Sequence, residues 1–510
     1  MLAPTGAEAA ALDSTAISTV GVPQPVLMEN AGRAAAMILQ RLRPSGRVVG
    51  VVGSGNNGGD ALVLLRTLRA WGRDVVAVVV ADRPLQDPLL HGWDVPMRTD
   101  EGLGAEGWRD LVGEEGLVVD GVLGTGLQGA PRERQRAAIE NINASARWVL
   151  SVDVPSGIDS ARGTVPGGAV QATVTVAFGA PKLGSLLHPA RSFAGRLIVV
   201  EIGFPPWSPT EVAARVVTPA WAQARLPERD SDTHKNAVGR VLVVAGQRGM
   251  AGAAVLAVRA SLRAGAGLVR ICSAPENREI VQSAIPEAIY VDPGDPGALQ
   301  QALEQCDAVG LGPGLGTGTF AQALAAAVAK GPPRPVVVDA DALNLASEGK
   351  LDLALLASTR AVLATPHAGE MARLLGTDTE TVQSDRLAAL HRAVEANRCA
   401  LLLKGAPSLL ATPEGEVFVD CQGSSDLAVA GMGDALSGVC ASLMAQGLDA
   451  GEAGSVGLYL TGRAARLAGR GPALTPSDVI RCLPDALGER SGGVSDLDLP
   501  FVLYDADPAR

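Results

Sequence analysis

Short apolar runs recur along the first part of the chain, and each is followed by a segment with helical spacing. The runs predict buried strands, of which Val48–Val52 is entirely apolar apart from one glycine. Strands that alternate with helices predict a doubly wound, mostly parallel sheet. We expect helices over Gly6–Ile17 and Pro25–Leu42 before the first strand. The strands are expected at Val48–Val52, Val75–Ala81, Leu117–Asp120, Trp148–Val154, Val174–Phe178 and Leu197–Ile202.

A second series of the same kind follows a break at the proline-rich segment Gly203–Pro209. Because 510 residues exceed one hydrophobic core, we predict an α/β protein of two domains, residues 1–212 and 213–510. The last hundred residues are expected to be mainly helical. The tail after about residue 491 carries no pattern that predicts its structure. Strands are expected at Arg240–Ala245, Gly267–Ile271, Ala308–Leu311, Pro335–Val338, Ala361–Ala364, Ala400–Leu403 and Glu416–Val419.

Composition and charge narrow the function classes. Hydrophobic residues make up 47% of the chain and aromatic residues 3%, which suits α/β layers better than a β-sandwich. The net charge of −11, without a basic run, argues against a nucleic-acid or anionic-membrane surface. Six cysteines without a C-x-x-C pair indicate a reducing compartment. No apolar segment reaches the roughly 18 residues of a membrane span, and no signal peptide is apparent, so a cytoplasmic enzyme is expected.

A stretch of glycine and asparagine follows the first predicted strand. Gly53–Asp60 is predicted to form a turn before a helix over Ala61–Ala70. Such a turn leaves N–H groups free at a helix N-terminus, where the dipole favours anions. It lacks the Gly-Lys-Ser/Thr ending of a nucleoside-triphosphate loop. Asn and Gly tolerate left-handed backbone angles, so we expect the turn to curl its amides around a phosphate-bearing ligand. For Asp60, dipole stabilisation in the first helical turn is a sufficient alternative explanation.

A second glycine loop, Gly124–Gly129, follows the strand expected at Leu117–Asp120. The carboxyl ends of neighbouring parallel strands share one edge of a sheet, so the two loops are expected to flank one ligand site. Asp120 and Asp153 each end a predicted strand at that edge, although an acid there is often only a helix cap. Ser156 is nearby and no histidine is. Oxygen ligands of this kind favour an alkali or alkaline-earth cation over zinc.

Four motifs of this half, taken in their order and spacing, resemble the NAD(P)H-hydrate epimerase family: NNGGD, DGVLGTGL, DVPSGID and AFGAPKLG. The resemblance covers about residues 5–205 and implies that Asp153 handles a proton at the hydrated nicotinamide ring. It implies a potassium ion on Asn57, Asp120 and Ser156. It also implies substrate contacts at Asp153 and along both loops, at Asn56, Asn57, Gly58, Gly59, Asp60, Gly124, Thr125, Gly126, Leu127, Gln128, Gly129 and Ala130.

The second half carries a candidate phosphoryl-transfer site. Gly431-Met432-Gly433 leads directly into a helix with Asp434 in its first turn, so the amides of residues 431–434 are expected to form an anion hole. Asp434 would then be the base for an attacking hydroxyl, with an ordinary capped helix start as the alternative. Lys404, one of five lysines, ends a predicted strand as a candidate phosphate ligand. His367, at a strand-to-helix corner, has too few neighbouring ligands for zinc.

Motifs of this half resemble the ADP-dependent NAD(P)H-hydrate dehydratase family of the ribokinase-like superfamily: HKNAVG, GMAGAA, GPGLG, DADALN, TPHAGE, KGAPS and GMGD. The resemblance spans about residues 220–490. It implies a ribokinase-like α/β/α domain after a Rossmann-like first domain, with ADP as co-substrate and Mg²⁺ at the second site. For Asp339 and Asp341 two roles stay open, contact with magnesium-bound water and simple capping. Implied contacts with the hydrated nicotinamide are Ala253, Gly314, His367 and Asp434. Implied contacts with the nucleotide are Lys404, Gly405, Ala406, Pro407, Ser408 and Gly433.

Together the two resemblances imply a bifunctional repair enzyme. It would epimerise (R)-NAD(P)H-hydrate to the (S) form and dehydrate the (S) form with ADP, giving NAD(P)H, AMP and phosphate. A ribokinase-like small-molecule kinase fused to a Rossmann-like ligand-binding domain is the alternative, and a non-catalytic scaffold is a third. The expected partners are NAD(P)H-hydrate and ADP, without nucleic acid or membrane. A homo-oligomer, the choice between NADH and NADPH, and the choice between ADP and ATP stay open.

Overall fold

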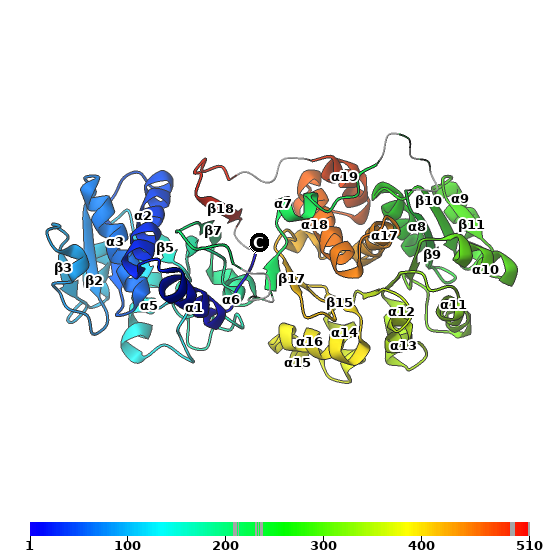
Figure 1. Cartoon of the computed structure of the whole chain (residues 1–510), viewed down its shortest axis with the longest axis horizontal. Coiled ribbons are helices and arrows are strands. Elements are labelled where there is room, and N and C mark those ends of the chain that lie inside the picture. Colours follow the sequence, from blue (N-terminus) through cyan, green and yellow to red (C-terminus); the bar gives the residue numbers. More distant parts are fainter. Residues whose placement is uncertain are drawn as a thin grey trace. The chain divides into compact units, whose positions relative to one another are not determined.

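The computed structural model describes residues 1–207, 212, 214–229, 232, 234, 238–489 and 495–507. The chain divides into two compact units (Figure 1). The first unit comprises Met1–Arg215 together with Val494–Arg510, and the second comprises Val216–Gly493. A sheet with helices around it forms the centre of each unit, so the two α/β domains expected from the strand–helix alternation are present.

The first sheet has the strand order β18-β7-β6-β5-β4-β1-β2-β3. Neighbouring strands from β3 to β7 are parallel. The strand order reverses between β1 and β4, which makes this pair the switch point beside which open α/β sheets bind ligands. The strands are β1 (Val48–Val52), β2 (Val75–Val79), β3 (Met97–Thr99), β4 (Leu117–Gly121), β5 (Trp148–Val152), β6 (Val174–Phe178), β7 (Arg196–Val200) and β18 (Val502–Ala506).

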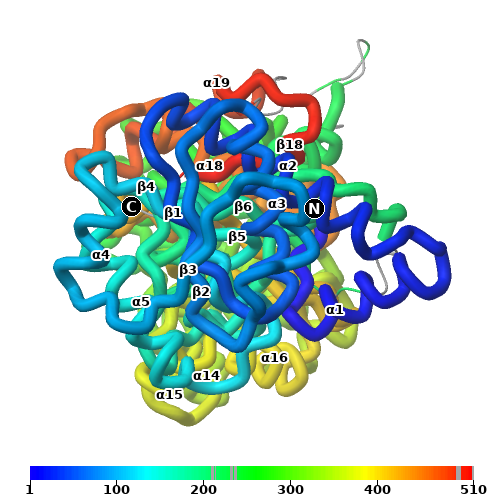
Figure 2. Tube along the Cα trace, turned by 90° about the vertical axis from the view of Figure 1, so that its left-hand side faces the viewer, coloured from blue at the N-terminus to red at the C-terminus, as the bar shows by residue number. Residues whose placement is uncertain are grey.

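Helices cover both faces of this sheet, as Figure 2 shows. Side chains of β1 alternate between the two layers: Val48 and Val52 pack with α2 and α3, whereas Val49 and Val51 pack with α4 and α5. The predicted first helix is α1, which passes into a π-helical turn at Ala16–Val20. The helices are α1 (Gly6–Thr15), α2 (Gln24–Leu42), α3 (Asn56–Ala70), α4 (Ala105–Val112), α5 (Glu133–Ser145) and α6 (Leu183–Leu186).

The second sheet has the strand order β11-β10-β9-β12-β13-β14-β15-β16-β17-β8, with its switch point between β9 and β12. Neighbouring strands from β11 to β15 are parallel to one another, and β16 is antiparallel to both β15 and β17. The strands are β8 (Ala214–Val216), β9 (Arg240–Val244), β10 (Leu268–Cys272), β11 (Ile289–Val291), β12 (Ala308–Leu311), β13 (Val336–Val338), β14 (Val362–Ala364), β15 (Ala400–Leu403), β16 (Ser408–Ala411) and β17 (Val417–Asp420).

One face of this sheet is covered by α8, α17, α18 and α19, which share a continuous apolar core with the strands. Helices α8 and α17 pack at small residues: a Cβ on Gly438 would lie 2.1 Å from the Ala257 carbonyl oxygen. The helices are α7 (Pro219–Gln223), α8 (Ala251–Arg263), α9 (Arg278–Ala284), α10 (Pro296–Gln305), α11 (Thr319–Lys330), α12 (Asp341–Ser347), α13 (Leu353–Ala357), α14 (Ala368–Leu375), α15 (Thr379–Ser384), α16 (Arg386–Asn397), α17 (Met432–Ala445), α18 (Ala450–Ala468) and α19 (Pro476–Gly488).

The end of the chain differs from the sequence-based expectation. Residues 213–510 were placed in the second domain, yet β18 pairs antiparallel with β7 of the first sheet, Ala506 opposite Leu197 (Figure 1). Arg196 fixes the pairing by donating from Nη2 to Oδ2 of Asp505 at 2.6 Å. The tail therefore completes the first unit and covers the edge of β7, which would otherwise leave backbone groups unpaired.

Candidate active sites

The first candidate site lies at the switch point of the first sheet, beyond β1, β4 and β5. The turn after β1 is shorter than predicted, because α3 begins at Asn56 and residues 56–60 are helical. None of Gly53, Gly58 or their neighbours in this turn has a positive φ, so the expected left-handed curl is wrong. A Cβ on Gly58 would lie 2.2 Å from the Gly53 carbonyl oxygen, and one on Gly53 would lie 2.0 Å from that of Val122. These glycines serve close backbone approach.

The loop after β4 lies against the start of α3. A Cβ on Gly124 would come 3.2 Å from Cγ of Asn57. The Ser160 hydroxyl donates to the Thr125 carbonyl oxygen at 3.0 Å and holds the loop in place. Every residue from Gly124 to Ala130 is at least partly exposed. The structure therefore brings the two glycine-rich segments side by side. Residues 54–56 and the loop 124–130 are exposed at least in part, whereas residues 57–60 are buried.

Asp120 lies at the centre of a buried hydrogen-bond network and has no exposed surface. Its Oδ2 accepts from the Ser151 hydroxyl at 2.8 Å and from the Ser156 amide at 2.9 Å. Its Oδ1 accepts from the Ser156 hydroxyl at 2.5 Å. Burial raises the pKa of Asp120, and these hydrogen bonds offset part of that rise. No ion pair reaches this carboxylate from the described residues, so its negative charge is compensated by dipoles alone.

Asn57 joins the same network through backbone carbonyl groups. Its Nδ2 donates to the carbonyl oxygen of Leu123 at 2.8 Å and to that of Val152 at 2.7 Å. The Leu123 amide in turn donates to the Ser156 hydroxyl at 2.8 Å. Asn57, Asp120 and Ser156, which the sequence grouped as cation ligands, therefore converge in one buried corner with two carbonyl oxygens.

Asp153 follows β5 and is held by a lysine. Its φ of 64° is uncommon for a residue other than glycine, and such angles cluster at functional sites. Its Oδ1 accepts from the ammonium of Lys182 and from the Phe178 amide, the latter at 3.1 Å. Lys182 is buried and also donates to the carbonyl oxygen of Phe178 at 3.1 Å. Among the described residues no donor reaches Oδ2 of Asp153, which leaves that oxygen for a substrate.

The second candidate site lies where the N-terminus of α17 meets the ends of β13 to β15. Gly431 has a left-handed φ of 87° and leads into α17 at Met432, with Asp434 in the first turn. A Cβ on Gly433 would lie 3.3 Å from Nζ of Lys404 and 3.7 Å from Oδ2 of Asp339. The start of the helix thus presents bare backbone next to a lysine, an arrangement that suits an anion.

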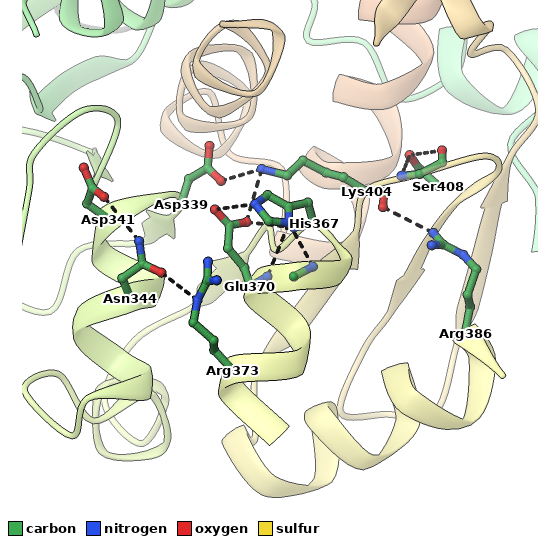
Figure 3. Close-up of polar contacts among 11 residues, drawn as sticks. Asp339, Asp341, Asn344, His367, Glu370, Arg373, Arg386, Lys404 and Ser408 are labelled. Carbon is green, nitrogen blue, oxygen red and sulfur yellow. Dashed lines mark hydrogen bonds and ion pairs between the residues drawn. The ribbon is translucent and has the colours of Figure 1, made fainter. Parts of the chain in front are cut away.

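Lys404 follows β15 and is held between two acids (Figure 3). Its Nζ lies 2.8 Å from Oδ1 of Asp339 and 3.8 Å from Oε2 of Glu370. Burial alone would lower the pKa of Lys404, but Asp339, Glu370 and Asp434 together raise it, so the ammonium stays charged. Asp339 therefore orients the lysine, whereas Asp341 accepts from the Gly316 amide at 2.7 Å.

Asp434 has the electrostatic properties of a base that works near neutral pH. Burial, reinforced by Asp339, raises its pKa to about 6 against the opposing effect of Lys404. A carboxylate with such a pKa can take a proton from a hydroxyl and release it again.

His367 begins α14 as its N-cap (Figure 3). Its Nδ1 accepts from the amides of Gly369 at 3.0 Å and Glu370 at 3.3 Å. The Glu370 side chain accepts in return from the His367 amide at 2.8 Å. Because Nδ1 is an acceptor, the ring carries a proton on Nε2, which lies 3.4 Å from Oε1 of Glu370, and the rest of the imidazole is exposed to a ligand.

The loop predicted to hold the nucleotide runs from Lys404 to the start of β16. Ser408 is the first residue of β16, and its hydroxyl lies 3.1 Å from the Gly405 carbonyl oxygen. Arg386 donates from Nη2 to the carbonyl oxygens of Lys404 at 3.3 Å and Pro407 at 3.2 Å (Figure 3). Burial lowers the pKa of Arg386 to about 10. This arginine fixes the backbone of the loop.

A polar cavity of about 530 Å³ opens beside the second site. Near it, Gly314 lies directly on α8, since a Cβ at that position would come 2.8 Å from Cβ of Ala253. The side chains that line the cavity include Gln247, Asp341, Asn344, Glu348 and Arg373. The cavity therefore offers room for a large polar ligand beside Arg373 of α14, the helix that His367 caps.

Four residues have structural roles that the sequence did not reveal. Lys182, which binds Asp153, was visible as one of five lysines within a recognised motif. Asp339 and Glu370 lie within recognised motifs too, but their contact with Lys404 depends on packing between strands. Nothing in the sequence distinguishes Arg386 from the other arginines, because its role depends on contact with a loop that only the folded structure reveals.

Comparison with known proteins identifies the family of the chain. The family model described as NAD(P)H-hydrate dehydratase matches residues 241–484, and the one described as YjeF-related protein N-terminus matches residues 24–184. The bifunctional NAD(P)H-hydrate repair enzyme of Moorella thermoacetica is 36% identical over 95% of this chain and 96% of that protein. The Escherichia coli enzyme of the same description is 33% identical over 88% of this chain and 86% of that protein. The chain belongs to the family of bifunctional NAD(P)H-hydrate repair enzymes.

The fold of the second domain agrees with this membership. A solved structure of a ribokinase-like superfamily protein from Enterococcus faecalis is 27% identical, with a TM-score of 0.50. It covers 54% of this chain and 96% of that protein, which confirms the ribokinase-like fold expected for the second half of the repair-enzyme chain. Within the described residues, no helix is long and apolar enough to span a bilayer. In the same part of the chain, no group of three or more His, Cys, Asp and Glu side chains is placed to hold a metal ion.

Proposed function

We propose that this chain repairs hydrated nicotinamide dinucleotides in two steps at two separate sites. The first unit epimerises (R)-NAD(P)H-hydrate to the (S) form, and the second dehydrates the (S) form with ADP. One observation carries the proposal: each sheet presents, at its carboxyl edge, a glycine-lined helix start beside an acid, the buried Asp153 in one unit and the partly buried Asp434 in the other. Membership of the repair-enzyme family supports the pairing of the two activities.

In the epimerase step, the hydrate lies between the start of α3 and the loop Gly124–Ala130. Epimerisation at C6 requires a bond at that carbon to break and re-form, with proton transfer. Asp153 is suited to this, because Lys182 and the Phe178 amide hold one of its oxygens and leave the other for the substrate. The backbone strain at Asp153 supports the assignment.

The corner formed by Asn57, Asp120 and Ser156 fits a potassium ion. It supplies one carboxylate and several neutral oxygens, a donor set with a single negative charge that suits a monovalent cation. The fully buried Asp120 gains no ion pair from the described residues, so a bound cation would compensate its charge. When bound there, potassium would supply a positive charge beside the two substrate-binding segments.

In the dehydratase step, Asp434 accepts the proton of the C6 hydroxyl as its oxygen attacks the terminal phosphorus of ADP. The bond from that phosphorus to the bridging oxygen breaks, and AMP leaves. The phosphorylated C6 then loses phosphate while a proton leaves C5, which restores the C5=C6 bond of NAD(P)H. The N–H groups around Gly433 and the ammonium of Lys404 stabilise charge on the transferred group.

The nucleotide is placed by the loop Lys404–Ser408, which Arg386 holds rigid. Mg²⁺ would bind together with the phosphates of the nucleotide, because Mg²⁺ is usually bound by one or two carboxylates and by substrate oxygens. Asp339 and Glu370 are the carboxylates within reach of Lys404. We name ADP as the nucleotide, and not ATP, because of the family resemblance.

Purified (R)- and (S)-hydrate test the proposal, each incubated with and without ADP. We expect recovery of reduced-nicotinamide absorbance from the (S)-hydrate only with ADP, and from the (R)-hydrate by way of the (S) form. AMP and phosphate should appear in amounts equal to the NADH recovered. A stable phosphorylated product without NADH would instead identify a small-molecule kinase. The absence of turnover with either epimer would indicate a non-catalytic scaffold.

A further inference from the structure

Three buried aspartates occupy the first site, and their environments differ. Asp120 accepts four hydrogen bonds, among them two from Ser156. Asp153 accepts from the Lys182 ammonium and from a backbone amide. Asp60 is 8% exposed, yet its carboxyl group receives no hydrogen bond and no ion pair from the residues that the structure describes. A carboxylate that deep without a donor is unfavourable, and protonation is the usual remedy.

The position of Asp60 on its helix removes the alternative explanation for it. Helix α3 begins at Asn56, so Asp60 is its fifth residue and no acid stands in the first turn. Stabilisation by the helix dipole falls off within that turn. The charged groups that act on Asp60 come from four other elements: Asp153 after β5, Asp13 on α1, Lys182 before α6 and Arg83 after β2.

The electrostatic setting agrees with a neutral Asp60. Burial raises the pKa of Asp60 well above its usual value, and the negative charges of Asp153 and Asp13 raise it further. Lys182 and Arg83 act in the opposite direction without reversing the effect. The ammonium of Lys182 is instead bound directly to Asp153. One site thus holds a carboxyl whose pKa is raised by its surroundings beside a second carboxyl that is paired with a lysine, and such a difference in environment is typical of an acid–base pair.

We propose that Asp60 is the general acid of the epimerase reaction and that Asp153 is its base. Asp153 takes the proton of the C6 hydroxyl, the C6–N1 bond breaks, and its electron pair passes to the ring nitrogen. That nitrogen takes the proton of Asp60, while C6 becomes an aldehyde carbonyl. After rotation about C5–C6, the nitrogen attacks the other face of the carbonyl group. The nitrogen then returns its proton to Asp60 and the new hydroxyl receives the proton from Asp153, so both groups are reset.

The substitution Asp60→Asn tests this assignment in the full-length chain. The amide keeps the shape and can donate a hydrogen bond, but it cannot transfer a proton. We expect kcat for epimerisation of the (R)-hydrate to fall about 100- to 10,000-fold, with KM within a few-fold of the unaltered enzyme. ADP-dependent dehydration of the (S)-hydrate, carried out by the other unit, is the control for folding. An unchanged kcat, or a rise in KM alone, would reduce Asp60 to a binding residue and overturn the inference.

Two further measurements do not depend on the variant's activity. The infrared difference spectrum between the unaltered chain and Asp60→Asn should show the carbonyl band of a protonated carboxyl at neutral pH, and a carboxylate band there would refute the neutral acid. After a single turnover in ¹⁸O-labelled water the C6 oxygen should be largely unlabelled, because a short-lived aldehyde exchanges its oxygen only through its hydrate, whereas one labelled oxygen per turnover would show C6–O cleavage and overturn the proposed step. The inference rests on the epimerase activity proposed above, and an unaltered chain without that activity would refute the activity itself.

Discussion

Replacing Asp434 by Asn should make the protein more stable and greatly slow its dehydratase activity. The carboxylate is partly buried at the N-terminus of α17, close enough to Asp339 to be destabilised by its charge. To accept a proton, Asp434 must be ionised, although its surroundings in the folded chain favour the protonated form. The amide of Asn has nearly the same shape, carries no charge and accepts no proton, so it separates the two effects.

The magnitude follows from the pKa. A rise from 3.8 to about 6 corresponds to about 3 kcal/mol, since each pKa unit is worth about 1.4 kcal/mol. The folded-state pKa lies above the unfolded one, so the stabilisation from protonation is fully present below about pH 4 and is lost as the pH rises through about 6. At pH 8 the unaltered chain should therefore be about 3 kcal/mol less stable than Asp434→Asn, and at pH 4 the two should be nearly equal.

Thermal unfolding of the ligand-free, full-length chain between pH 4 and 8 measures this difference. A gain of about 3 kcal/mol in a domain of this size should raise the Tm of the second unit by about 5–10 °C at pH 8. The same variant should dehydrate the (S)-hydrate about 100- to 10,000-fold more slowly. Glu414→Gln, a neutralised exposed acid on the β16–β17 turn, is the matched control and should leave Tm unchanged. A difference between Asp434→Asn and the unaltered chain that is independent of pH would refute the reasoning.

Three further predictions separate the two units. Gly433→Ala places a methyl group 3.3 Å from Nζ of Lys404, and steady-state assays should show a loss of about 100-fold in dehydration with epimerisation intact. Lys182→Met leaves Asp153 buried without its cation, so calorimetry should show the first unit destabilised by about 3–5 kcal/mol while dehydration of the (S)-hydrate is retained. Exchanging potassium for tetramethylammonium should slow epimerisation alone, and Ser156→Ala should raise the potassium concentration needed for half-maximal rate. Equal effects on both activities would contradict each assignment.

The strand positions could be predicted because central strands are apolar along their whole length. Val48–Val52, Ala308–Leu311 and Ala400–Leu403 were predicted with the bounds that the structure shows. Strands at the sheet edges escaped, because exposed or half-exposed positions interrupt their apolar pattern. Strand β18 is the clearest case: it pairs with β7, about 300 residues earlier, and no local signal reveals that pairing.

The site residues were predictable where a motif carried them and unpredictable where packing creates the contact. Motifs grouped Asn57, Asp120 and Ser156, which the structure brings together. They gave no account of Asp60 as an unpaired acid, because its lack of donors depends on α3 beginning at Asn56 instead of five residues later. The start of a helix is set by which turn residues fit between backbone segments, and periodicity does not report that.

Mixing two variants, each inactive at one site, tests most directly the claim that each unit holds its own catalytic aspartate. Asp153→Asn should be unable to use the (R)-hydrate but able to dehydrate the (S)-hydrate, and Asp434→Asn should epimerise without dehydrating. An equimolar mixture of the two chains with (R)-hydrate and ADP should recover NADH well above either variant alone. A mixture no more active than its components, with both chains folded, would contradict the account of two independent sites.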